Sequence, residues 1–177
     1  AYYLVPSNTI LFGVGEQSII KVTGASIAEK MFIPQNTSNI TFSNLKFIGN
    51  AQSAGNGDGV CIMVQCTSAN VSNIEISDCV FENFKGDGWV WLFNSSTDKS
   101  IDDVRIFNNI FRSRTGNARN PTSTAVPCGC VWADSTNDTT AKITNLQIKR
   151  NTAIIPHIKS FSLLWNGVEN AVVENNV

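Results

Sequence analysis

The sequence has little charge, a single histidine and no long apolar run. Only 15% of its 177 residues are charged, the formal net charge is −1 and no basic run occurs, so no electrostatic attraction to nucleic acid is expected. No apolar stretch approaches the ~18 residues that span a bilayer, so no membrane insertion is expected. His157, alone in the sequence, does not favour a histidine-rich metal site or a catalytic triad.

Helical periodicity is also missing. No segment keeps the ~3.6-residue apolar period of a helix over more than about two turns. Instead there are 21 asparagines, many beside serine, threonine or glycine, which suits turns and strand ends. Apolar residues make up 42% of the chain, enough for a sizeable core. The composition therefore indicates a single all-β domain.

A short apolar–polar alternation that ends in a polar corner is repeated along the chain. Its copies begin at Ile40, Ile74, Val104, Leu146 and Ala171, and a second apolar strand precedes each copy. Strands of a sandwich or barrel are usually joined by hairpin turns, whereas each corner here is followed by renewed strand. The pattern predicts a solenoid of about five coils, stacked at the strand spacing of ~4.8 Å.

Each copy places a polar residue at the same corner. Stacked side chains there can hydrogen-bond their own backbone and one another, so we expect a structural ladder. Its predicted members are Asn44, Asp78, Asn108, Arg150 or Asn151, and Asn175.

The five cysteines include no metal-type Cys-x-x-Cys pair; they are Cys61, Cys66, Cys79, Cys128 and Cys130. Cys128 and Cys130 would point the same way on a strand, which leaves packing thiols and a disulfide between coils both open. Their apolar neighbours favour buried, free thiols.

The opening of the chain carries a family resemblance. The phrase from Leu4 to Gly15, followed by Ser18-Ile19-Ile20-Lys21, resembles the early coils of the right-handed parallel β-helix of the pectate-lyase superfamily. The resemblance implies one such β-helix over residues 1–177, with a polar loop inserted around 112–127, and we expect the chain to be a segment of a longer protein. Lyases, glycosidases, epimerases, phage tailspikes and adhesins share this fold, so the fold alone assigns no activity.

Two aspartates are candidate catalytic residues. Asp58 and Asp87 each precede a glycine at what looks like the same point of consecutive coils, so their Cα atoms are expected ~5 Å apart. Two carboxylates that close raise the pKa of one of them, which suits an acid partnered by a base or nucleophile in glycoside cleavage. Asn56-Gly57-Asp58-Gly59 also resembles the Asn-Thr-Asp-Gly phrase of polygalacturonase-type glycosidases, whose other motifs are missing.

Other interpretations of these aspartates stay open. Either carboxylate can cap backbone amides in a turn, and the pair could also supply oxygen ligands to a divalent cation. We therefore assign neither a metal nor a cofactor.

Tryptophans and arginines are the candidate substrate-binding residues. Trp91 and Trp132 are predicted at the same place in neighbouring coils, beside Ile62, with Trp89 close by. Pointing outward, they would offer flat faces to sugar rings or to a second subunit; pointing inward, they would be core. These strands are apolar at both odd and even positions, so periodicity does not decide whether the tryptophans point inward or outward. Arg112 and Arg114 could bind acidic sugars or be merely solvated.

The resemblance implies a role in engaging polysaccharide at an extracellular or virion surface. We expect a phage tailspike-like receptor-binding or depolymerase protein, as a homotrimer that contacts cell-surface glycan. The alternatives are a secreted polysaccharide lyase or glycosidase, and a non-catalytic adhesin or structural spike.

Overall fold

The computed structural model describes residues 2–21, 30–49, 60–84, 88–112, 129–136, 140–155 and 161–177. These residues contain strands and turns and no helix. The strands form three parallel sheets, here named A, B and C. Sheet A contains β1 (Tyr3–Leu4), β4 (Lys30–Ile33), β7 (Val60–Cys66), β10 (Gly88–Asn94), β13 (Gly129–Ser135) and β16 (Ser162–Leu164).

Sheet B contains β2 (Thr9–Phe12), β5 (Ile40–Ser43), β8 (Val71–Ser77), β11 (Ile101–Phe107), β14 (Ile143–Lys149), β17 (Val168–Glu169) and β18 (Val172–Glu174). Sheet C contains β3 (Ile19–Lys21), β6 (Lys46–Ile48), β9 (Val80–Glu82), β12 (Ile110–Arg112) and β15 (Thr152–Ile154).

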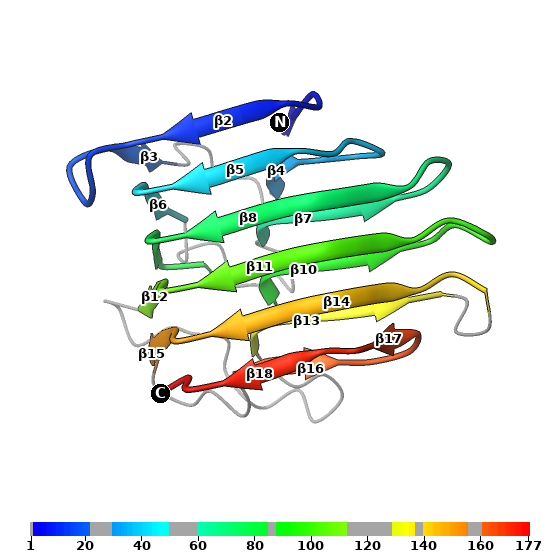
Figure 1. The fold of residues 1–177 in the computed structure, drawn as a ribbon. Helices are drawn as coiled ribbons and strands as arrows, with labels where there is room; N and C mark the ends of the chain where they lie inside the picture. Colours follow the sequence, from blue (N-terminus) through cyan, green and yellow to red (C-terminus); the bar gives the residue numbers. More distant parts are fainter. Residues whose placement is uncertain are drawn as a thin grey trace, which may run out of the picture.

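The chain passes through sheets A, B and C in turn and then starts the next coil. Strands β1 to β17 therefore pair with the strand three places away, and β18 pairs with β14, always in parallel. Figure 1 shows sheet B in front, with successive coils stacked between the two termini and wound in the right-handed sense. The described residues make five complete coils and part of a sixth. The predicted all-β parallel β-helix is confirmed.

The pairing of sheet B confirms the repeat to the residue. Ile40 lies opposite Ile74, Ile74 opposite Val104, and Val104 opposite Leu146. Sheet B alternates buried and accessible residues at these positions, which is why its register could be derived from the sequence.

The core is built from columns of identical or similar side chains. Phe47, Phe81 and Phe111 of sheet C are fully buried and stacked, with ring centroids 5.3 and 4.8 Å apart. Facing them are aliphatic columns of sheets A and B, which belong to the same apolar cluster. In-register parallel pairing places equivalent side chains of successive coils above one another, so each coil buries the face of the next.

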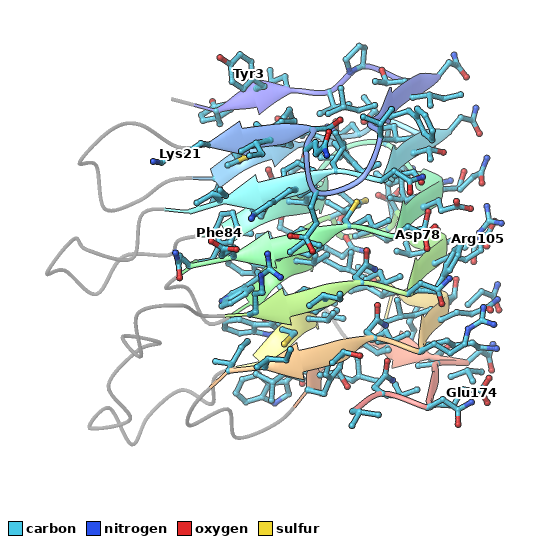
Figure 2. All side chains as sticks on the ribbon, turned by 90° about the vertical axis from the view of Figure 1, so that its left-hand side faces the viewer. Tyr3, Lys21, Asp78, Phe84, Arg105 and Glu174 are labelled. Atoms are coloured by element: carbon cyan, nitrogen blue, oxygen red, sulfur yellow. The ribbon has the colours of Figure 1, made fainter. Side chains whose placement is uncertain are left out.

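The corner between sheets B and C contains the predicted polar column, in a modified form. Every predicted corner residue has a positive φ, which asparagine tolerates better than most residues. These residues are Asn44, Asp78, Asn108, Arg150 and Asn175. Figure 2 looks onto sheet C and shows Asp78 at this corner, with Phe84 on the opposite side.

Two members of this polar column are joined, since the Asn108 side-chain amide donates to Asp78 Oδ1 at 3.3 Å. A longer hydrogen-bonded ladder runs through the next residue along, and it includes the predicted alternative Asn151 with Asn109 and Asn176. The Asn151 side-chain oxygen accepts the backbone N–H of Asn109 at 2.9 Å, and Asn109 in turn accepts that of Cys79 at 2.9 Å. The Asn151 amide also donates to the Ile106 carbonyl at 3.0 Å. Because Asn109 and Asn151 are buried, this ladder satisfies backbone groups that water cannot reach.

We predict that Asn151→Ala lowers the free energy of unfolding by about 1–3 kcal/mol for each buried donor that loses its acceptor. Chemical denaturation measures the change. Gln147→Ala is the matched control, because this amide lies on the accessible side of sheet B, and it should change stability by less than ~0.5 kcal/mol. Equal effects of the two substitutions would contradict the ladder's role.

Four cysteines lie in the described part of the chain, and all are buried and free: Cys61, Cys66, Cys79 and Cys130. This confirms buried, free thiols at those positions, while Cys128 lies outside the described residues. Burial raises the pKa of Cys66 to about 11 and that of Cys79 to about 12.

We therefore predict that these four thiols resist alkylation by iodoacetamide at pH 8 in the folded protein and react once it is unfolded, because the thiolate is the nucleophile. Mass spectrometry of the modified peptides gives the result for each cysteine. Rapid native labelling of Cys79 would show that its surroundings are more open than the structure indicates.

Candidate functional site

The outer face of sheet A carries a stack of indole rings. Trp91 of β10 lies opposite Trp132 of β13, with ring centroids 5.2 Å apart and an interplanar angle of 19°. Both side chains are half-buried, and their sequence neighbours Val90, Leu92 and Val131 are in the core. Strand residues alternate between faces, so both indoles point away from the core.

Further aromatic rings extend this stack in both directions. Trp165, with 52% of its surface exposed, lies 6.1 Å from the Trp132 ring, and Phe93 lies 5.1 Å from Trp91. We name the four residues Phe93, Trp91, Trp132 and Trp165 the aromatic face. At its Trp91 end it packs against Ile33, Val60 and Met63, a cluster separate from the main core.

The indole N–H groups of Trp91 and Trp132 have no hydrogen-bond acceptor among the described residues. Both Nε1 atoms are buried and unpaired, which costs about 1–3 kcal/mol for each group. Native proteins rarely leave such groups without a partner unless the site has another role. The aromatic face therefore differs from ordinary core packing.

Trp89 lies on the opposite side of the strand. It is only 3% exposed and packs against Phe84 and Phe111, with centroid separations of 5.8 and 6.0 Å. Trp89 and Val90 are consecutive and both belong to the core cluster, so strict alternation fails here. Of the three predicted tryptophans, Trp91 and Trp132 come together on the outer face, and Trp89 does not join them.

The predicted neighbour of the tryptophan pair was wrong by one residue. Met63, not Ile62, lies opposite Trp91, and Ile62 pairs with Val90 inside the core. In β7 nearly every residue is buried, so no alternation distinguishes one register from the next.

Asp58, Asp87 and Arg114 lie outside the described residues, as do most of the predicted loop 112–127 and His157. Nothing is therefore derived about the distance between the two aspartates.

Arg112 is described, and it lies on sheet C within a cluster of alternating charges. Its Nε is 3.0 Å from Glu82 Oε2, and its Nη2 is 2.6 Å from Glu16 Oε2. Lys46, which is buried, completes the cluster at 3.2 Å from the same Glu82 oxygen. The hydrogen bond with Glu16 raises the pKa of Arg112, and the Arg112 partner lowers the pKa of Glu16. Carboxylates thus surround the guanidinium, on a different sheet from the aromatic face.

A carboxylate that sequence reasoning missed lies on the aromatic face. Asp134 of β13 is two residues beyond Trp132, so both side chains project from the same side of the strand, and it lies opposite Phe93. Burial raises the pKa of its carboxyl group, and a hydrogen bond with the Ser135 backbone opposes the shift only partly. The two-residue spacing from Trp132 is the sequence signal that could have identified it.

Metal and membrane features are missing from the described ranges. Those ranges contain no group of three or more His, Cys, Asp or Glu side chains suited to hold a metal ion. They also contain no helix long and apolar enough to cross a membrane.

No family model matches the chain, and no curated protein matches it. The fold and the site define the class on their own. The chain is an all-β parallel β-helix that presents a stack of tryptophans beside a half-buried carboxyl group on one outer face.

The charge cluster on sheet C is expected to be structural. Glu82→Gln leaves Lys46 and Arg112 without their shared carboxylate, so we predict a loss of about 3 kcal/mol in the free energy of unfolding, measured by denaturation.

Glu16→Gln is the matched control, with an expected loss below ~1 kcal/mol because that side chain is half exposed. The pKa of Glu16 is lowered in the folded state, so its contribution is present above the ordinary carboxyl pKa and is lost as the pH falls. Glu16→Gln should therefore weaken the acid dependence of stability. A larger effect of Glu16→Gln than of Glu82→Gln would contradict this account.

Proposed function

We propose that this β-helix engages polysaccharide through the aromatic face of sheet A. The observation that carries the proposal is the stack of Trp91 on Trp132, extended by the exposed Trp165. Sugar rings have apolar C–H faces, which pack on flat indole surfaces, and hydroxyl edges, which need hydrogen-bond partners.

The arrangement also suits repeated ligands. The indoles of Trp91 and Trp132 are stacked on each other one coil apart, so they present their outer edges in a fixed order, and Trp165 supplies an exposed ring surface beside Trp132. Packing of Trp91 against Met63 and Phe93 holds the platform before a ligand arrives, which lowers the ordering cost of binding.

The rest of the proposal rests on the resemblance of the opening coils to the pectate-lyase superfamily. We place the chain in a phage tailspike-like receptor-binding or depolymerase protein, a homotrimer at a virion or other extracellular surface, with cell-surface glycan as its partner. Binding is the part of the proposal that the described residues support. Any catalysis depends on Asp58 and Asp87, which lie outside them.

Substitution of Trp165 is the direct test of binding. Because Trp165 is exposed, Trp165→Ala should fold normally and weaken binding to the recognised glycan about three- to tenfold, as read by titration calorimetry after a polysaccharide panel has identified that glycan. Phe12→Ala is the matched control, since Phe12 is 65% exposed on sheet B, and should leave affinity unchanged. Unchanged affinity of the Trp165 variant, or equal losses in both, would overturn the proposal.

Product analysis on the same panel separates the alternatives. New reducing ends without ultraviolet absorbance indicate a hydrolase, and unsaturated products indicate a lyase. Any activity that survives both Asp58→Asn and Asp87→Asn excludes the acidic pair as its source. Retained binding without cleavage favours the adhesin.

A further inference from the structure

Sheet A carries almost no charge. Its six strands contain only two charged residues, Lys30 and Asp134. The Lys30 ammonium lies 5.6 Å from the centre of the Trp91 ring, at one end of the aromatic face. Asp134 lies on β13, two residues beyond Trp132 and opposite Phe93 of β10.

Aromatic rings border Asp134 on several sides. Phe93 lies opposite it on β10, and Trp132 projects beside it from its own strand. On the far side the chain turns at Trp165, whose backbone N–H donates to the Ala133 carbonyl at 2.9 Å. Among the described residues, burial raises the pKa of this carboxyl group and the Ser135 backbone N–H lowers it.

We infer that Asp134 sets the specificity of the aromatic face, accepting hydrogen bonds from hydroxyl groups of a sugar stacked on Trp165 beside the edge of Trp132 and disfavouring glycans that carry carboxylates. This inference rests on the proposed function and adds the class of ligand, which is an uncharged glycan.

The expected hydrogen bonds follow from the chemistry of the Asp134 carboxylate and the sugar hydroxyls. An ionised carboxylate only accepts hydrogen bonds, and its two oxygens can accept from two neighbouring hydroxyls. Together with the flat indole of Trp165, it offers one surface to the apolar face of a sugar ring and one acceptor to its polar edge.

The expected preference for uncharged over acidic glycans follows from electrostatics. A sugar carboxylate on Trp132 or Trp165 would bring a second negative charge close to Asp134, among apolar rings where water screens it weakly. Arg112, the described cation predicted to attract acidic sugars, lies on sheet C between Glu16 and Glu82. Neutral sugars avoid the repulsion and keep the hydrogen bonds, so the difference in affinity favours them.

Matched glycans and a near-isosteric variant test the inference. The probes are polygalacturonate, alginate and hyaluronan, each compared with its carboxyl-reduced form, in which every acid is a primary alcohol. The wild-type protein should bind a reduced form about tenfold more tightly than its acidic parent. Asp134→Asn should remove this preference by strengthening binding to the acidic form, while affinity for the reduced form changes by no more than about threefold.

The pH profile gives a readout that a purely structural role would not move. On the described elements beside Asp134, the facing side chains are Phe93, Trp132 and Trp165, none of which carries an acidic or basic group, and the other charged residue of the sheet A strands, Lys30, lies near Trp91. The pKa of Asp134 is raised, so lowering the pH neutralises it while ordinary sugar carboxylates are still charged. Binding of the acidic form by the wild type should rise in that window, and the Asp134→Asn profile should be flat.

The outcomes separate the two claims. If Trp165→Ala loses binding but the wild-type protein prefers the acidic form, this inference is overturned. The proposed function then still stands. A preference for the reduced form that persists in Asp134→Asn overturns it as well. Failure of every probe to bind contradicts the proposed function, and this inference falls with it.

Discussion

In-register parallel stacking of coils is the constraint on which the rest of this structure depends. Backbone hydrogen bonds between equivalent strands fix the distance and the order of the coils, so a residue type repeated in sequence becomes a column in space. The buried phenylalanine stack, the asparagine ladder and the outer tryptophan stack are three results of that one constraint. The three columns differ only in whether their side chains lie inside the coil or on its outer surface.

A column of side chains inside the coil stabilises the fold, whereas a column on the outer surface is available to a ligand. The Asn151 side chain hydrogen-bonds to backbone groups of a neighbouring coil, and Phe81 is enclosed between equivalent rings. Trp91 and Trp132 also touch one another, yet in the described part of the chain their indole N–H groups find no acceptor, and Trp165 next to them is exposed. The same stacking that gives stability inside the coil therefore produces an ordered apolar surface outside it, which is the physical basis of the proposed glycan contact.

Sequence reasoning succeeded where alternation was strict and failed where it was not. The sheet B repeat predicted the pairing of Val104 with Ile74 and with Leu146 without error, because buried and accessible residues alternate there. In sheet A nearly every residue of β7 is buried, so the neighbour of Trp91 was misplaced by one position and Trp89 could not be assigned to the core. One partner of Arg112 is Glu16, 96 residues away, a contact that no local pattern indicates. Asp134 went unnoticed because it belongs to no repeated motif, and its two-residue spacing from Trp132 gains meaning only once Trp132 is known to point outward.

The central claim is that glycan contacts the outer tryptophans and not the inner one. Indole N–H resonances of the ¹⁵N-labelled protein, assigned with single Trp→Phe variants, measure this directly during titration with the recognised polysaccharide. The account predicts that the Trp132 and Trp165 resonances shift in a saturable way while Trp89, enclosed by Phe84 and Phe111, stays in place as an internal reference. Saturable binding that leaves the Trp91, Trp132 and Trp165 resonances unmoved would contradict it.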